Sequence, residues 1–231
     1  MNWSQLRFIG GGIDECQAYT DGNIVYRAVP ENTTLWKHIP AFLASDNYKQ
    51  LVEEKLMIKA EKTDIDPATF PSIHAGNRTN RIIYKSELIP FGIHPIRYGH
   101  IWTKAHFIEY LRTIAKINQI LENHICAEPS FGNFLFNGPN CTLVDIGAIA
   151  PKTKTTIAEL KNGLIKLLPP EYDITKFQFN NPNVWKQIQQ HCDKIPKKDA
   201  SDQWDEYSNT RPLPKPGETT STNKEVIWLQ E

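Results

Sequence analysis

The stretch from Ile125 to Gly147 constrains the fold most, because it places two short apolar runs on either side of a turn sequence. The runs are residues 134–136 (FLF) and 143–144 (LV), and the turn is residues 137–140 (NGPN). This pattern predicts a β-hairpin. Three polar side chains flank the runs and would gather at one end of the hairpin: Glu128, Asn133 and Asp145. An ordinary hairpin with solvated acids fits the same residues.

The segment resembles the catalytic and metal-binding loops of the protein-kinase-like superfamily, in which H-[RG]-D-x-x-x-x-N precedes an [IV]-D-[FIW]-G element by about a dozen residues. Asp145, in the run DIG, matches the Asp that holds Mg²⁺, and Asn133 matches the Asn that holds a second metal. Glu128 stands where the family has its catalytic Asp, and Cys126 where it has His. The resemblance implies ATP and Mg²⁺ (or Mn²⁺) as cofactors, with Glu128, Asn133 and Asp145 as catalytic residues.

Upstream of the hairpin, residues 103–123 carry apolar side chains at the spacing of one helix face. The face consists of Phe107, Leu111, Ile114, Ile117 or Asn118, and Leu121. This periodicity predicts a helix of about five turns that leads into the candidate site, as the long central helix of the large lobe does in the superfamily. Before it, residues 81–92 resemble the strand and hinge between the two lobes. The resemblance implies that backbone groups of Glu87, Leu88 and Ile89 face the adenine.

Near the amino terminus, residues 6–9 predict a short strand that runs into three glycines, Gly10, Gly11 and Gly12. A turn at residues 21–22 and a β-prone run at residues 24–29 follow. The order resembles the small lobe of the superfamily, in which a glycine loop covers ATP phosphates with backbone amides. Glu15 stands about where that loop would have its third pattern glycine. A glycine triplet also marks turns and bulges.

Arg27 corresponds to the strand lysine of the family's V-A-I-K motif. Arginine keeps the positive charge but has a planar fork in place of a compact ammonium. Three roles stay open for Arg27: a phosphate contact, an ion pair with a helix glutamate, or an exposed strand residue. The helix would span residues 46–62, with Glu53 or Glu54 as the partner and an apolar stripe of Tyr48, Leu51, Val52 and Leu56.

Beyond the hairpin, the sequence predicts two more helices. A capping box at residues 156–159 (TIAE) opens the first, with Ile157, Leu160, Leu164 and Leu167 facing inward and prolines 169 and 170 ending it. The second spans residues 183–192. From residue 195 the composition turns polar and proline-containing, as is typical of a tail that is partly disordered or extended. The expected organisation is a small β-rich lobe at 1–90, a helical lobe at 91–194 and a tail at 195–231.

Composition limits the range of partners. The chain of 231 residues has 26 basic and 26 acidic side chains, so its zero net charge gives no general electrostatic case for nucleic acid or a membrane surface. No apolar run approaches the roughly 20 residues that span a bilayer. We expect a cytoplasmic protein, or one delivered into a host cell by a specialised secretion route. The four cysteines lack metal spacing, so most are expected to be buried thiols.

These features predict an α+β, two-lobed protein-kinase-like fold, with a small antiparallel β lobe, a mostly helical lobe and a nucleotide cleft between them. The leading hypothesis for function is ATP- and Mg²⁺-dependent phosphoryl transfer, with a protein as substrate. The alternative is an inactive pseudokinase that binds a nucleotide or a partner. A third hypothesis is AMP transfer to a protein, which would use the metal residues without the base.

Overall fold

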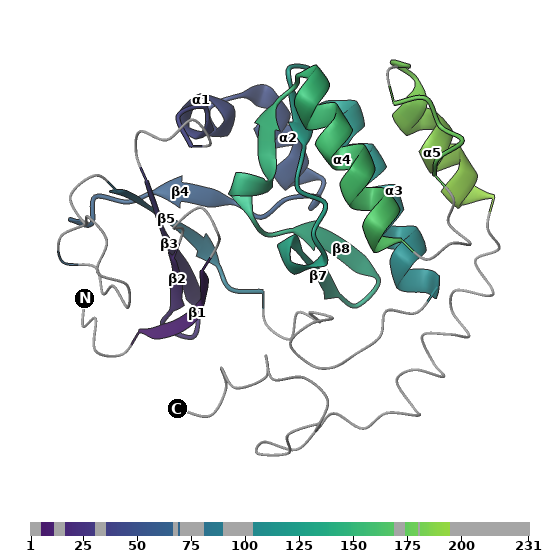
Figure 1. The fold of residues 1–231 in the computed structure, drawn as a ribbon. Helices are drawn as coiled ribbons and strands as arrows, with labels where there is room; N and C mark the ends of the chain where they lie inside the picture. Colours follow the sequence, from purple (N-terminus) through teal and green to yellow (C-terminus); the bar gives the residue numbers. More distant parts are fainter. Residues whose placement is uncertain are drawn as a thin grey trace, which may run out of the picture. The chain divides into compact units, whose positions relative to one another are not determined.

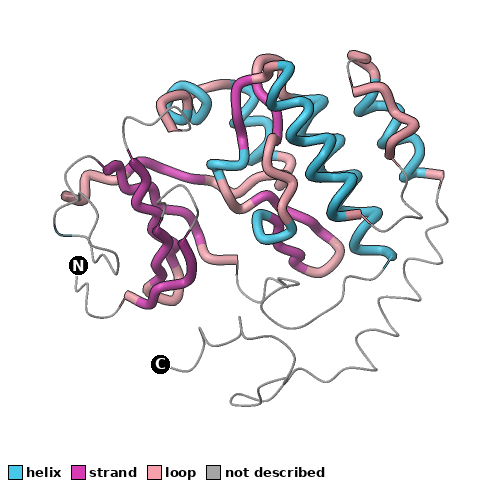
Figure 2. The backbone as a smooth tube through the Cα atoms, viewed as in Figure 1, coloured by secondary structure: helices cyan, strands magenta, loops and turns pink. Residues whose placement is uncertain are grey.

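The computed structural model describes residues 6–11, 17–30, 36–66, 69, 81–89, 104–168, 174–179 and 181–194. The chain divides into two compact units, Met1–Pro90 and Phe91–Glu231. Strands dominate the described part of the first unit and helices that of the second (Figure 2). The α+β class predicted from the sequence is confirmed. The predicted tail at 195–231 lies outside the described residues.

The first unit is built on one antiparallel sheet with the strand order β1-β2-β3-β5-β4 (Figure 1). Its strands are β1 (Arg7–Gly11), β2 (Gln17–Thr20), β3 (Ile24–Pro30), β4 (Ala60–Lys62) and β5 (Arg81–Glu87). Strand β3 pairs with β5 along its whole length, with Ile24 opposite Glu87 and Pro30 opposite Arg81. The strands expected at residues 24–29 and from Arg81 onward are therefore confirmed.

The central strand β3 is covered on both faces, because Val25, Tyr26, Ala28 and Val29 are all buried. One core cluster combines Tyr19, Tyr26, Ala28 and Ile83, and partly buried Leu6, Phe8, Ile24 and Ile65 pack against it. The β2–β3 connection is the tight turn expected at Asp21 and Gly22. Asp21 Oδ1 accepts the backbone N–H groups of Asn23 and Ile24, and Gly22 takes the positive φ of 103° that this turn requires.

The described part of the first unit also contains two α-helices, α1 (Ile39–Leu43) and α2 (Asp46–Glu53). The helix expected over residues 46–62 is wrong in its extent, because α2 ends at Glu53 and residues 60–62 form β4. Lys55 adopts a left-handed conformation with φ of 58°. The N–H groups of Leu56 and Lys55 then bond the carbonyls of Leu51 and Val52, at 2.9 and 3.0 Å, which is a Schellman motif.

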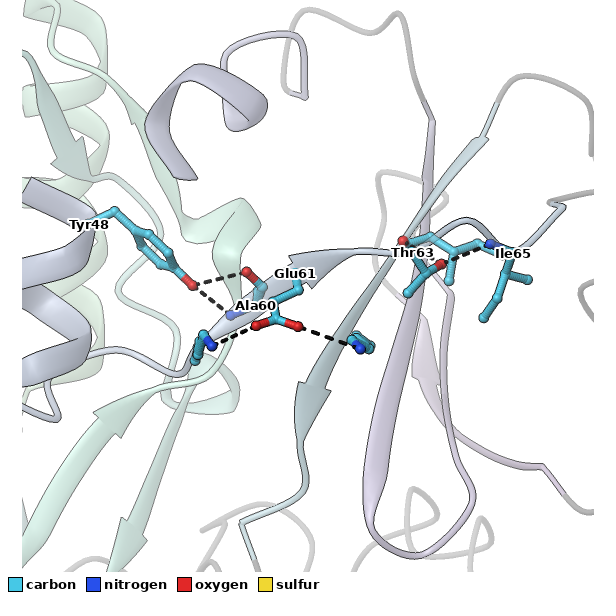
Figure 3. A network of polar contacts seen from close by, with 8 residues as sticks. Tyr48, Ala60, Glu61, Thr63 and Ile65 are labelled. Atoms are coloured by element: carbon cyan, nitrogen blue, oxygen red, sulfur yellow. Dashed lines mark hydrogen bonds and ion pairs between the residues drawn. The ribbon is translucent and has the colours of Figure 1, made fainter. Parts of the chain in front are cut away.

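The Tyr48 hydroxyl links α2 to β4 (Figure 3). It accepts the Ala60 N–H at 2.5 Å, and the Ala60 and Ile58 carbonyls lie 3.3 Å away as acceptors. Next to this contact, Glu61 forms exposed ion pairs with Lys59 at 2.6 Å and Lys85 at 3.5 Å. The buried Tyr48 hydroxyl thus holds the chain that follows α2. A helix extended to residue 62 would lose the hydrogen bond between this hydroxyl and the Ala60 N–H.

In its described residues, the second unit combines three α-helices with two short strand pairs. The helices are α3 (Lys104–Ile120), α4 (Lys154–Leu167) and α5 (Val184–Asp193). The strands are β6 (His124–Cys126), β7 (Phe134–Asn137), β8 (Asn140–Leu143) and β9 (Ile149–Pro151). Strand β6 pairs antiparallel with β9, and β7 with β8. The predicted hairpin is confirmed: Asn137 pairs with Asn140, and Gly138 in the turn has φ of 59°.

Helix α3 is the core element of this unit. Of the predicted apolar face, Leu111, Ile114 and Leu121 are buried, and so are both candidates for the middle position, Ile117 and Asn118. Helix α5 packs along α3 (Figure 1). Arg112 joins the two helices: its Nε donates to Asp193 Oδ1 at 3.0 Å, and its Nη2 donates to the Cys192 carbonyl at 3.3 Å.

Helix α4 begins earlier than expected. Its N-cap is Thr153, whose hydroxyl accepts the Thr156 N–H while the Thr156 hydroxyl accepts the Thr153 N–H, so the capping box lies at residues 153–156 and the one expected at 156–159 is wrong. Leu160 and Leu164 are buried as predicted.

Cys126, Cys141 and Cys192 are buried free thiols, as expected. No helix in the described part of the chain is long and apolar enough to cross a bilayer.

The left-handed Lys55 generates a stability prediction. A residue with a Cβ is strained at this φ by about 1 kcal/mol relative to glycine. Lys55→Gly should therefore raise the free energy of unfolding relative to Lys55→Ala, which removes the same side chain but keeps the strain. Urea denaturation of both variants measures the difference. Equal urea midpoints for the two variants would contradict the left-handed conformation of Lys55.

Candidate functional site

The open end of the β7–β8 hairpin brings Asn133 and Asp145 together. Phe134 pairs with Leu143, and the ladder continues one step further because the Val144 N–H donates to the Asn133 carbonyl at 2.8 Å. Phe134, Phe136, Cys141 and Leu143 are buried, so one face of the hairpin lies in the core. Asn133 and Asp145 are both half-buried at the edge of that core.

Glu128 is connected to Asn133 through its backbone. The Asn133 amide Nδ2 donates to the Glu128 carbonyl at 3.2 Å, and the Asn133 N–H donates to the Ser130 carbonyl at 3.0 Å. A single 3₁₀ turn, Phe131–Asn133, closes this loop, with Ser130 as its N-cap. The first bond sets the orientation of the Asn133 amide, with Nδ2 toward the loop. The Glu128 side chain itself is exposed.

Asp145 caps the next 3₁₀ turn, Ile146–Ala148. Its Oδ1 accepts the Gly147 N–H at 3.0 Å, which holds the carboxylate in one orientation. The Ala148 carbonyl in turn accepts the N–H groups of Ala127 at 2.8 Å and Glu128 at 3.4 Å. The loop that carries Glu128 and the loop that carries Asp145 are therefore tied together by backbone hydrogen bonds.

Cys126 precedes Glu128 by two residues, and its thiol has a shifted pKa. Burial first, and then the negative charges of Glu128 and Asp145, raise the pKa of the Cys126 thiol. Cys126 stays a neutral thiol, which argues against a nucleophilic role because the thiolate is the reactive form.

Helix α3 supports the loop through two residues that the sequence did not identify as functional. Asn118 is 4% exposed; its Nδ2 donates to the Ile114 carbonyl at 2.9 Å and its Oδ1 accepts the Cys126 N–H at 3.0 Å. Tyr110 is fully buried, and its hydroxyl donates to the Pro129 carbonyl. The sequence does place Tyr110 and Asn118 among the buried positions of α3, which could have marked them as structural hydrogen-bonding residues. Their partners in the loop could not be predicted from residue spacing.

The glycines of the first unit differ from the expected loop. Gly10 and Gly11 belong to β1, opposite Ala18 and Gln17 of β2, and a register shift separates Phe8 from Gly10. The strand was expected to end before Gly10, and this is wrong; glycine here accompanies a bulge. Gly12 lies outside the described residues, and so does Glu15. Phosphate binding by the three glycines stays a prediction.

Arg27 on β3 is half-buried, and its Nη1 donates to the Ser86 hydroxyl at 3.4 Å. Among the described residues Arg27 forms no ion pair, and Glu54 instead accepts a hydrogen bond from Gln50 at 2.8 Å. The pair with a helix glutamate, one of the three roles left open, is thus not formed in this structure. A phosphate contact stays a prediction.

The expected adenine-facing segment follows β5 directly. The Leu88 N–H donates to the Asn23 carbonyl at 2.7 Å, so this backbone donor is already used inside the first unit. Glu87 is the last residue of β5, and Leu88 and Ile89 are half-buried. The expected adenine contacts of Glu87 and Ile89 stay predictions, whereas the Leu88 N–H could serve adenine only if it left Asn23.

The residues at the hairpin end fit a hard cation. Asp145 and Asn133 offer carboxylate and amide oxygens, the ligand types that Mg²⁺ prefers. Among the described residues, no group of three His, Cys, Asp or Glu side chains could hold an ion. Mg²⁺ bound with a nucleotide does not need one, because it takes one or two protein ligands and fills its other positions with phosphates and water.

Asn118 generates a second prediction. Asn118→Ala removes two buried hydrogen bonds and leaves the Cys126 N–H without its acceptor, which should lower the free energy of unfolding by about 1 to 3 kcal/mol. The matched control is Gln119→Ala, which removes the exposed neighbouring amide that bonds Gln189; surface changes of this kind cost about 0.5 kcal/mol or less. Thermal denaturation of both variants measures the difference, and equal losses would contradict the support assigned to Asn118.

Comparison with known proteins gives resemblance to solved structures alone. No protein-family model matches the chain, and no curated protein sequence matches it. The structure of WaaP in complex with acyl carrier protein aligns with a TM-score of 0.45 at 10% sequence identity, covering 89% of this chain and 89% of WaaP. The structure of monomeric WbdD aligns with a TM-score of 0.47 at 13% identity, covering 78% of this chain and 44% of WbdD.

Proposed function

We propose that the chain is an ATP- and Mg²⁺-dependent phosphotransferase that acts on a hydroxyl group of a protein. The observation that carries the proposal is the hydrogen-bonded network at the hairpin end. There, Asn133 joins the Glu128 loop to the residue before Asp145 through bonds of 3.2 and 2.8 Å. An acid, an amide and a second acid held in this way match the parts that phosphoryl transfer needs.

In this proposal Asp145 would hold one metal ion and Asn133 a second, as the resemblance implies. Asp145 Oδ1 is engaged by the Gly147 N–H, so Oδ2 is the oxygen assigned to the ion. Asn133 supplies its Oδ1, because Nδ2 donates to the Glu128 carbonyl. Mg²⁺ would neutralise charge on the β- and γ-phosphates. The two side chains are oriented by existing hydrogen bonds, and little ordering is left to be done on binding.

Glu128 is assigned the role of accepting the proton of the acceptor hydroxyl. Its side chain is exposed, as a group that meets a protein substrate must be. Its carboxylate has the chemistry of the family's Asp but reaches one methylene further, about 1.5 Å. A displacement of about 1 Å can cost on the order of a hundredfold in rate, so the proposal requires that the loop geometry compensates.

The second candidate is a catalytically inactive pseudokinase that binds a nucleotide or a protein partner. Two observations favour it. Arg27 contacts Ser86 and forms no ion pair among the described residues, and the Leu88 N–H is already bonded to Asn23. Both features depart from what the resemblance implies for a working nucleotide lobe. AMP transfer is the remaining alternative, because it uses the metal ligands without requiring Glu128.

One experiment separates these functions. The protein is incubated with ATP labelled on the γ- or the α-phosphate, with Mg²⁺ or Mn²⁺, together with cell lysate as a source of protein and small-molecule acceptors. γ-Label on protein supports the proposal, and γ-label on small molecules keeps phosphoryl transfer but changes the acceptor. α-Label on protein indicates AMP transfer. Transfer of neither label supports the inactive pseudokinase.

Asp145→Asn tests the metal assignment. The amide oxygen can still accept the Gly147 N–H, so the fold should keep its melting temperature, whereas loss of the charge should abolish the stabilisation that Mg²⁺ adds to ATP binding. Thermal shift with ATP, with and without Mg²⁺, measures this. The control is Glu122→Gln, which removes an exposed charge of the same unit between α3 and β6. An unchanged Mg²⁺ effect in Asp145→Asn would refute the metal site.

Glu128→Ala and Glu128→Asp together test the base. If Glu128 accepts the proton, Ala should lower turnover by about 10² to 10⁴-fold, and Asp should also be impaired because its carboxyl group is pulled back. Single-turnover transfer from γ-labelled ATP measures both. Turnover that appears or rises in Glu128→Asp would instead indicate a degenerate kinase. Wild-type rates in both variants would remove Glu128 from the chemistry.

A further inference from the structure

Pro129, which follows Glu128 directly, is held at two points by two different helices. The Tyr110 hydroxyl of α3 donates to its carbonyl. On α4, Gly163 makes room for its ring, since a Cβ at position 163 would lie 2.7 Å from Pro129 Cγ and 3.1 Å from Cδ. The first of these distances is shorter than any ordinary carbon contact. Any larger residue at 163 must therefore displace the loop or the helix.

Tyr110 is itself fixed in place. It is fully buried, and its ring stacks edge-on against Phe131 at 5.2 Å and Phe134 at 5.0 Å between centroids. These two residues bracket the 3₁₀ turn that ends at Asn133. Burial raises the pKa of the Tyr110 hydroxyl well above its usual range, so the group remains a hydrogen-bond donor. One side chain thus contacts the loop both before and after Gly132.

We propose that Tyr110 is a positioning residue for Glu128 and Asn133, acting through the Pro129 carbonyl and the ring contacts with Phe131 and Phe134. The inference rests on the proposed function. The segment from Ala127 to Ser130 has no regular secondary structure, so its conformation depends on such tertiary contacts. Asn118 fixes the chain before the segment, at Cys126, and Tyr110 fixes it after Glu128. The acid is therefore held from both sides by one helix.

Tyr110→Phe tests this proposal, because it removes the hydroxyl and keeps the ring. The matched control is Tyr48→Phe in the first unit, which removes a similarly buried hydroxyl that bonds the Ala60 backbone (Figure 3). We expect Tyr110→Phe to lower kcat by about tenfold to a hundredfold while KM for ATP changes by less than about twofold. Tyr48→Phe should keep the wild-type kcat at a temperature where both variants are folded.

Amide hydrogen exchange provides a readout that does not depend on turnover. The Glu128 N–H, bonded to Ala148, and the Asn133 N–H, bonded to Ser130, should exchange about tenfold faster in Tyr110→Phe, with α5 amides unchanged. Tyr48→Phe should leave both amides at wild-type rates. Faster exchange of these two amides supports the positioning role even if the wild type transfers no phosphate, an outcome that would refute the proposed function alone.

If Tyr110→Phe does not fold, Gly163→Ala probes the same loop from α4. Alanine favours the helix but presses on Pro129, so kcat should fall although helix propensity rises. Asn162→Ala, at the exposed neighbouring position, is the control for propensity. A wild-type kcat together with wild-type exchange at Glu128 and Asn133 in the folded variant would overturn the proposal. So would a kcat that falls equally in Tyr110→Phe and Tyr48→Phe.

Discussion

Irregular backbone inside a core must find hydrogen-bond partners, and in this protein helix α3 supplies them for the candidate site. Asn118 accepts the Cys126 N–H and Tyr110 donates to the Pro129 carbonyl, on either side of Glu128. An unpaired buried backbone group costs about as much as a lost hydrogen bond. The two polar residues therefore determine where the loop leaves β6 and where it enters the 3₁₀ turn before β7. The position of Glu128 follows from these contacts.

The two loops of the site are linked to each other as well as to α3. The Ala148 carbonyl accepts N–H groups from Ala127 and Glu128, while Asn133 bonds to both Glu128 and Val144. A shift of either loop would break the hydrogen bonds that join the two loops. The backbone segments that carry Glu128, Asn133 and Asp145 are therefore coupled. Next to these loops, burial first, and then the charges of Glu128 and Asp145, raise the pKa of the Cys126 thiol.

The first unit holds its candidate residues by strand register. Arg27 lies opposite Tyr84 on the β3–β5 pair, and its guanidinium reaches diagonally to Ser86. Gly10 and Gly11 lie in β1 at a register shift, where the absence of a side chain suits a bulge. These contacts explain the conformation of Arg27, Gly10 and Gly11.

Local periodicity and turn chemistry were enough to predict α3, α5, β5 and the β7–β8 hairpin, because these elements repeat their burial pattern over many residues or carry a Gly-Pro turn. The same hairpin predicted that Asn133 and Asp145 would meet. The end of α2 and the start of α4 were mispredicted. Helix α2 ends early because Lys55 adopts a left-handed conformation and the buried Tyr48 hydroxyl bonds the Ala60 backbone. Helix α4 starts early because the capping box forms at Thr153 and not at Thr156.

The amino-acid sequence by itself therefore determined α3, α5, β5, the β7–β8 hairpin and the chemical types gathered at the hairpin end. The support of the site was decided by tertiary structure alone. Tyr110 meets Pro129 across 19 positions, and Gly163 meets the same residue from a helix that follows the site in the chain. Such contacts depend on how helices pack against a loop, and no spacing rule encodes them because they follow no period of a helix or strand.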